Sequence, residues 1–159
     1  MTSILRLKQE YEEYVKEPNC MYSIELNNNN FYNWNVLIFG PMGTIFEGGI
    51  FKCNILFSQN YPNEAPKITF VTKLPHPNIY TNGTICISIL HNGVDEFGYE
   101  NINERWNPSH SVNSILLSII SILNEPNLDS PANIDIALLW KNNIEEYKKI
   151  VYDIISNTI

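Results

Sequence analysis

The sequence predicts an α+β domain in which helices pack against a four-stranded antiparallel sheet. Two observations lead to this fold class. Short segments of alternating apolar and polar residues, separated by turn residues, recur between positions 21 and 71. Apolar residues spaced three or four apart occur before that region, up to position 16, and again from position 112 onward. One helix, four strands and then further helices make an α+β chain.

Length and composition limit the function classes. The chain has 159 residues, 44% of them hydrophobic, which suits a single domain over residues 1–159. It has no apolar run near the roughly 20 residues of a membrane span and no signal peptide, so we expect a cytoplasmic protein without direct membrane insertion. The net charge of −7 argues against a nucleic-acid partner. Three cysteines without a C-x-x-C pair argue against disulfides and a metal site.

The first predicted helix runs to about Lys16, with Thr2 or Ser3 as its N-cap. Its apolar stripe comprises Ile4, Leu7, Tyr11 and either Tyr14 or Val15. The opposite face carries charged residues, namely Arg6, Lys8, Glu10 and Glu13. Such a face is often only a solvated surface.

Four strands are predicted next, at Met21–Leu26, Trp34–Phe39, Phe51–Phe57 and Lys67–Val71. The asparagine run from position 27 to 30 supplies the first turn. In the third strand the alternation places Cys53 on the apolar face, so we assign this cysteine to the core. Sequential strands joined by short turns predict an antiparallel meander.

Helical periodicity resumes at Val112–Leu123, where apolar residues surround most of the helix axis. This pattern predicts a central buried helix, which Pro126 ends. A short third helix is expected to begin with Ser130 as N-cap and Pro131 at its first position.

The last helix is expected to begin at Asn142 or Asn143. Glu145 or Glu146 could complete a capping box there. Its apolar seam comprises Ile144, Tyr147 or Lys148, Val151, and Ile154 or Ile155. The helices should pack on one face and at the ends of the sheet.

The stretch His76–Leu90 fits neither a helix nor a strand. Prolines on both sides of His76 hold the backbone extended, and Asn82-Gly83 marks a tight turn. The stretch therefore predicts a fixed loop that presents the carboxamide of Asn78 and the thiol of Cys86. Taken singly, a cysteine between isoleucines is usually a core residue, and an asparagine in such a loop is usually a turn former.

In combination, these residues resemble the ubiquitin-conjugating enzymes. The motifs that carry the resemblance are, in chain order, Tyr61-Pro62 with Pro66, His76-Pro77-Asn78, Cys86, Trp106, Glu125-Pro126-Asn127 and Ala132-Asn133. The likeness extends from the first helix to the last. The run CISILH, followed by an acidic loop and Glu104-Arg105-Trp106, is similar to the G2-like subtype. That subtype has an acidic insertion after the cysteine and serves degradation of endoplasmic-reticulum and other proteasome substrates.

The resemblance implies that Cys86 receives the C-terminal carboxyl of ubiquitin as a thioester. An activating enzyme would use ATP to load it, so the chain itself needs no cofactor. For Asn78 the resemblance leaves two roles open, a hydrogen-bond donor to the oxyanion or a brace for the loop. His76 and Pro77 are expected to order the loop.

The acidic loop His91–Glu104 is implied to act on the attacking lysine. His91 opens the loop, and Asp95 and Glu96 are expected to help position the acceptor lysine. Without the resemblance, a solvated acidic loop would be the simpler interpretation.

The resemblance also implies a surface for the activating enzyme and a RING-type ligase. This surface comprises the first helix and the loops Tyr61–Pro66 and Trp106–Ser109. The candidate contacts are Arg6, Lys8, Pro62, Asn63, Trp106, Asn107 and Pro108. Many relatives have an aromatic residue at the position of Asn63, which leaves the choice of ligase open.

The sequence leaves three alternatives open. A cysteine hydrolase would use Cys86 with Asn78 and either His91 or His110 as base. A non-catalytic ubiquitin-binding variant of the fold typically lacks the cysteine. The carried modifier could also be another ubiquitin-like protein. The favoured hypothesis is a ubiquitin carrier that builds degradation signals with a ligase, and any location at the endoplasmic-reticulum surface would come through a partner.

Overall fold

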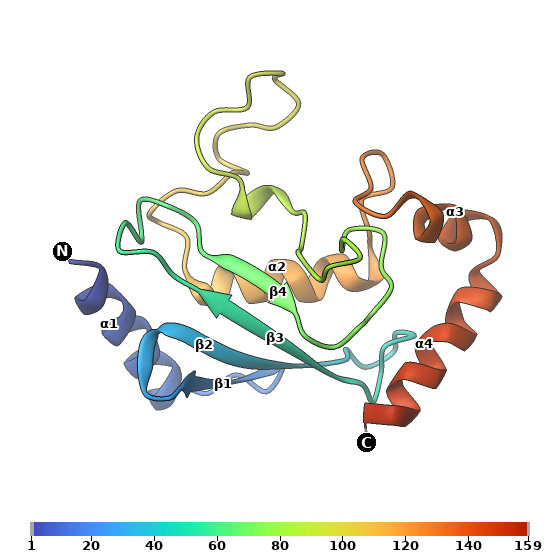
Figure 1. The fold of residues 1–159 in the computed structure, drawn as a ribbon, viewed down its shortest axis with the longest axis horizontal. Coiled ribbons are helices and arrows are strands. Elements are labelled where there is room, and N and C mark those ends of the chain that lie inside the picture. The colour runs from blue at the N-terminus through green and yellow to red at the C-terminus, as the bar shows by residue number, and fades with distance from the viewer. Residues whose placement is uncertain (1, 159) are drawn as a thin grey trace.

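The computed structural model describes residues 2–158 and confirms the predicted α+β class (Figure 1). A four-stranded antiparallel sheet is combined with an N-terminal helix, a central helix and two C-terminal helices. The elements are α1 (Ser3–Lys16), β1 (Tyr22–Asn27), β2 (Asn30–Phe39), β3 (Ile50–Leu56), β4 (Lys67–Phe70), the short 3₁₀ helix η1 (Ser88–Leu90), α2 (Val112–Asn124), α3 (Ile134–Asn142) and α4 (Ile144–Thr158).

The sheet is a meander with the strand order β1-β2-β3-β4. The asparagine run forms its first turn, because Asn28 and Asn29 adopt positive φ angles of 53° and 60° and allow Asn27 to pair with Asn30. Alternate residues of β2 and β3 point into the core, among them Trp34, Val36, Phe51, Cys53 and Ile55. The assignment of Cys53 to the core is confirmed.

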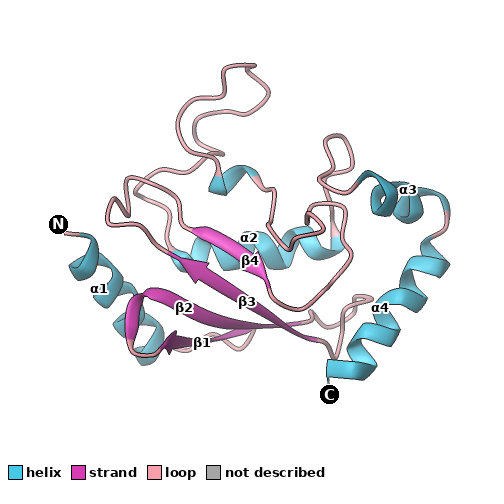
Figure 2. Cartoon of the chain, in the orientation of Figure 1, coloured by secondary structure: helices cyan, strands magenta, loops and turns pink. Residues whose placement is uncertain are grey.

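The helices lie around this sheet as the sequence predicts. Figure 2 shows α1 at one end of the molecule and α3 and α4 at the other, with α2 passing behind β4 between them. Six apolar residues of α2 are buried, namely Val112, Ile115, Leu116, Ile119, Ile120 and Leu123. None of the helices within residues 2–158 combines the length and apolar character needed to cross a bilayer.

The predicted cap of the first helix is confirmed. The side chain of Thr2 accepts a hydrogen bond from the backbone N–H of Leu5 and caps α1. Tyr14 rather than Val15 continues the buried stripe of α1, since Val15 is 56% exposed. Ser111 caps α2 and forms a reciprocal capping box with Ser114.

The predicted start of the third helix is wrong. Asn133, not Ser130, is the N-cap of α3, and its side chain accepts a hydrogen bond from the N–H of Ile136 at 3.2 Å. The segment before it is held outside the helix because the N–H groups of Ala132 and Asn133 both donate to the carbonyl of Pro77, at 2.8 and 3.0 Å. This contact attaches the start of α3 to the His76–Leu90 loop.

The predicted capping box of the last helix is also wrong. The side chain of Asn143 accepts a hydrogen bond from the N–H of Glu146 at 3.2 Å, which is half of the motif. The N–H of Asn143 donates instead to the carbonyl of Leu139 at 2.8 Å, because the residue also closes α3. Because α4 follows α3 directly, the N–H of Asn143 is already bonded within α3. The side chain of Glu146 therefore has no N–H group to bind at this cap.

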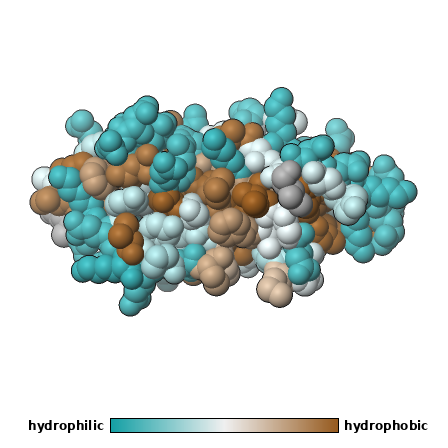
Figure 3. Space-filling model, turned by 90° about the horizontal axis from the view of Figure 1, so that it is seen from below, coloured by the Kyte–Doolittle hydropathy of each residue, from teal (hydrophilic) through white to brown (hydrophobic). Residues whose placement is uncertain are grey.

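Some apolar side chains stay on the surface. Among the strand residues that point away from the core, Leu37, Ile50 and Leu56 are 37–45% exposed. Seen from below, apolar side chains form a broken band along the length of the molecule, and hydrophilic ones lie around it (Figure 3).

Candidate active site

Cys86 is held between two buried neighbours. Ile85 and Ile87 are each only 6% exposed, whereas Cys86 is partly exposed. The backbone N–H of Cys86 donates to the carbonyl of Asn78 at 2.9 Å. The isoleucines thus anchor the segment in the core while the thiol stays accessible, which distinguishes Cys86 from the buried Cys53.

The turn before Cys86 requires glycine. Gly83 has a φ of +90°, and a Cβ there would lie 2.4 Å from the carbonyl oxygen of Phe70. This close approach lets the N–H of Phe70 donate to the carbonyl of Gly83 at 2.8 Å. The end of β4 is thereby fixed to the loop that carries the thiol.

Asn78 braces this loop against the segment after α2. Its side chain is 1% exposed, and its Nδ2 donates to the carbonyl of Asn127 at 2.9 Å. In return, the N–H of Asn127 donates to Oδ1 of Asn78, also at 2.9 Å. The geometry supports the bracing role, because both ends of the carboxamide are bonded to Asn127.

His76 is a buried structural residue in this geometry. Its Nε2 lies 2.9 Å from the carbonyl of Leu123, and its Nδ1 accepts the N–H of Asn78 at 3.1 Å. These partners select the tautomer with the proton on Nε2. Burial lowers the pKa of His76 from 6.5 to about 4 and outweighs the opposing effect of the carbonyls of Leu123 and Ile122.

The buried His76 should make stability depend on pH. Its folded pKa of about 4 lies below the usual 6.5, so the unfolded chain binds more protons between these values. The free energy of unfolding should therefore fall by about 2 kcal/mol more in the natural protein than in His76→Asn as the pH drops from about 7 to about 5. Denaturant unfolding of both proteins across this range measures the difference. Parallel pH dependence of the two proteins would contradict a buried neutral His76.

The acidic loop gives its two predicted carboxylates different surroundings. Asp95 accepts hydrogen bonds from the N–H groups of Phe97, Tyr99 and Glu100, at 3.0, 2.8 and 2.9 Å. These bonds, that of Phe97 first, hold the pKa of Asp95 below its usual range. Asp95 therefore shapes the loop, whereas Glu96 is exposed and has no hydrogen-bonding partner within residues 2–158.

The base of the acidic loop is closed by His91 and Arg105. Nδ1 of His91 lies 2.8 Å from Oε1 of Glu100, and the guanidinium of Arg105 pairs with the same carboxylate. Burial raises the pKa of Glu100, but the neighbouring polar groups of Ser88, His91 and Arg105 outweigh it and lower the pKa overall. Sequence reasoning missed Arg105 as an organising residue; the available signal was a single basic residue at the end of an acidic loop.

The loops of the expected ligase surface are joined through Trp106. Its indole N–H donates to the carbonyl of Pro62 at 2.8 Å, and its ring lies 5.7 Å from that of Tyr61. Asn63 and Pro108 remain exposed beside this contact. The structure therefore brings together the two predicted surface loops.

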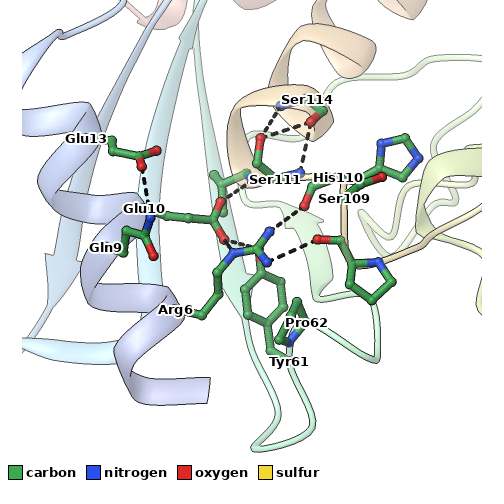
Figure 4. Close-up of polar contacts among 12 residues, drawn as sticks. Arg6, Gln9, Glu10, Glu13, Tyr61, Pro62, Ser109, His110, Ser111 and Ser114 are labelled. Carbon is green, nitrogen blue, oxygen red and sulfur yellow. Dashed lines mark hydrogen bonds and ion pairs between the residues drawn. The ribbon is translucent and has the colours of Figure 1, made fainter. Parts of the chain in front are cut away.

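Arg6 and Lys8, the two predicted basic contacts on α1, differ in exposure. Arg6 points into the molecule and donates to the carbonyls of Pro108 and His110, at 3.1 and 2.7 Å (Figure 4). Lys8 is exposed, with Nζ over the ring of Phe31 at 5.7 Å. Of the two, Lys8 is the residue free to meet a partner.

Glu10, which sequence reasoning did not assign to the site, connects this network. Its side chain is 8% exposed and accepts from Nε of Arg6 at 3.0 Å, from the N–H of Val112 at 2.8 Å and from the hydroxyl of Tyr61 (Figure 4). Burial, followed by the neighbouring Glu10 carboxylate, raises the pKa of Tyr61. The signal in the sequence was the spacing of four between Arg6 and Glu10.

The arrangement around Cys86 differs from that of a cysteine hydrolase. His76 is bonded to Leu123 and Asn78, and His91 is bonded to Glu100. Nε2 of His110 is buried without a partner. None of these histidines hydrogen-bonds to the thiol within residues 2–158. Fold and site thus define a domain that presents one braced, partly exposed thiol to which no histidine within residues 2–158 is bonded.

Comparison with known proteins gives the family. Residues 6–155 match the family model described as ubiquitin-conjugating enzyme. The chain is 45% identical over 151 residues to the "Probable ubiquitin-conjugating enzyme E2 7" of Caenorhabditis elegans, covering 94% of this chain and 92% of that protein. It is 41% identical over 160 residues to the human "Ubiquitin-conjugating enzyme E2 G2", covering 99% and 97%. The chain therefore belongs to the ubiquitin-conjugating enzyme family, whose members are ubiquitin transferases.

Proposed function

We propose that Cys86 accepts ubiquitin as a thioester from an activating enzyme and transfers it, with a RING-type ligase, to lysines of substrates or of ubiquitin. The thiolate attacks the activated C-terminal carbonyl of ubiquitin, forms the thioester bond and expels the activating enzyme's thiolate. A lysine amine then attacks the same carbonyl, and the sulfur of Cys86 leaves as the isopeptide bond forms. Each step exchanges one acyl bond for another.

The observation that carries this proposal is the braced, partly exposed thiol of Cys86. Hydrolysis of the thioester would release ubiquitin before it reaches a lysine. A histidine base beside the thiol would promote this hydrolysis by activating water. His76 and His91 are bonded elsewhere, and His110 makes no hydrogen bond to the thiol within residues 2–158. Asn78, fixed to Asn127, keeps the loop in place during transfer, and an oxyanion role for it would require one of these bonds to open.

A charging assay tests the proposal. The chain is incubated with ubiquitin, activating enzyme and ATP, and the products are separated on non-reducing and reducing gels. We expect a product heavier by one ubiquitin that thiol reductant removes. If the folded chain stays uncharged beside an activating enzyme that charges another carrier, ubiquitin is not its modifier.

The human relative is named E2 G2, and this chain has an acidic loop after its cysteine. We propose on this basis that the chain serves proteasomal degradation, including that of endoplasmic-reticulum substrates. It would act as a cytoplasmic enzyme that a partner brings to the endoplasmic-reticulum membrane. Assembly of ubiquitin chains that the proteasome binds would support this role. Transfer of single ubiquitins only would argue against it.

The exposed charge of Glu96 should assist the attacking lysine. Glu96→Gln removes the charge without altering the hydrogen bonds that shape the loop, so charging should stay normal while discharge to free lysine slows about threefold at low salt. The difference should shrink as salt screens the charge. Glu12→Gln on the exposed face of α1 is the matched control. Equal discharge rates for the two variants would show that Glu96 is only solvated surface.

Asp95→Asn probes shape as well as charge, because Asp95 accepts three backbone N–H groups. We expect a larger decrease in lysine discharge than for Glu96→Gln, with charging unchanged. Single-turnover discharge from the purified thioester measures both variants directly. Identical effects of the two substitutions would mean that the loop geometry set by Asp95 does not contribute.

A further inference from the structure

The acidic loop rests directly on the ligase loop, defined here as Tyr61–Pro66. The backbone N–H of Ala65 donates to Oδ1 of Asn92 at 2.8 Å, although the two residues are 27 positions apart in the chain. Asn92 is the second residue of the acidic loop. A side chain of the acidic loop thus meets a backbone donor of the surface expected to receive the ligase.

Arg105 holds Asn92 and the rest of the loop together. Its Nη2 donates to the carbonyl of Asn92, and its Nε to the carbonyl of Gly93, both at 2.8 Å. Its Nη1 pairs with Glu100, so the guanidinium joins the beginning of the acidic loop to its later part. Because the side chain of Arg105 is only 12% exposed, this arrangement is shielded from water more than a surface ion pair would be.

The hydrogen bonds around Arg105 also extend to the segment that carries Cys86. Glu100, held by Arg105, is hydrogen-bonded to His91, which directly follows η1. The carbonyl of His91 accepts the N–H of Trp106 at 2.9 Å, and the indole of Trp106 donates to Pro62. Figure 1 shows the acidic loop projecting from this base. Two sets of bonds therefore connect the ligase loop to the base of the acidic loop.

We propose that Asn92 and Arg105 are positioning residues that couple the ligase loop to the acidic loop. A contact at Pro62–Ala65 would change the position of the Ala65 N–H, and the bond to Asn92 would pass that change to the loop that faces the acceptor lysine. The inference rests on the proposed function, since it assigns a ligase and an acceptor to these two loops. Coupling predicts that a change in the ligase loop alters the acidic loop.

The experiment uses the whole chain and needs no ligase. Asn63→Lys changes the exposed part of the ligase loop, and the response is the shift of the backbone amide resonances of Tyr99 and Glu100. We expect a clear response in the natural protein and a response smaller by about threefold or more in Asn92→Ala. Asn92→Asp keeps an acceptor for the Ala65 N–H and should therefore show the same response as the natural protein. Asn103→Ala, an exposed asparagine of the same loop without a hydrogen bond in the structure, is the matched control.

A second readout concerns function. Asn92→Ala should charge normally but discharge to free lysine about threefold to tenfold more slowly, as the loss of one hydrogen bond allows, while Asn92→Asp stays near the natural rate. An amide response and a discharge rate of Asn92→Ala equal to those of Asn103→Ala would overturn the proposal. Failure of Asn92→Asp to restore the response would also overturn it. Absence of charging in the natural chain would instead refute the proposed function and leave the amide measurement valid.

Discussion

Replacement of Cys86 by alanine is expected to abolish charging with ubiquitin, because the acyl group then has no sulfur to receive it. Replacement by serine should yield a smaller amount of adduct that survives thiol reductant, since an oxygen ester is not exchanged by thiols. The measurement is the gel mobility of the adduct with and without reductant. Both variants should keep the natural stability, because the side chain of Cys86 is partly exposed.

Cys20→Ser supplies the matched control for this prediction. Cys20 is an exposed thiol that lies between α1 and β1, outside the braced loop. It should charge as the natural protein does, since reactivity here depends on the loop that positions Cys86 and not on exposure of a thiol. A reductant-sensitive adduct that persists in Cys86→Ala and disappears in Cys20→Ser would reassign the carrier residue.

Replacement of Glu10 by alanine is expected to cause the largest loss of stability among the charged residues of α1. It would leave Arg6, the hydroxyl of Tyr61 and the N–H of Val112 without their shared acceptor. Leaving such groups unpaired should lower the free energy of unfolding by about 3 kcal/mol. For a chain of this length the melting temperature should fall by roughly 6–12 °C.

Glu13→Ala is the matched control on the same helix. Its carboxylate accepts only an exposed hydrogen bond from Gln9 at 3.3 Å, so its loss should change stability by less than about 0.5 kcal/mol. Denaturant unfolding of the two variants compares them. Similar stability of Glu10→Ala and Glu13→Ala would mean that water replaces the lost acceptor and that the network does not stabilise the junction of α1, α2 and the ligase loop.

Periodicity and turn chemistry determined most of the fold from the sequence. The alternation around Cys53 placed it in the core, and the asparagine run marked the first turn of the meander. The wide apolar coverage of Val112–Leu123 identified α2 as the central helix. These features are local, because they depend on the side-chain period of a strand or helix and on the φ angles that particular residues tolerate.

The start of α3 could not be found in this way. Ser130 and Pro131 have the composition of a helix start, yet the carbonyl of Pro77 binds the two N–H groups that follow them. That acceptor is more than fifty positions away in the sequence. A capping signal only states which residues can begin a helix, whereas long-range hydrogen bonds decide which of them does.

By itself, the sequence determined the fold class, the loop that presents Cys86 and the family resemblance, because each of these depends on residue patterns within short segments. The tertiary structure alone decided that Asn78 is bonded to Asn127, that Glu10 accepts the N–H of Val112, and that Asn92 accepts the N–H of Ala65. The physical reason is the same in each case. A polar side chain has several possible partners, and only packing of distant elements selects the one that satisfies it once water is excluded.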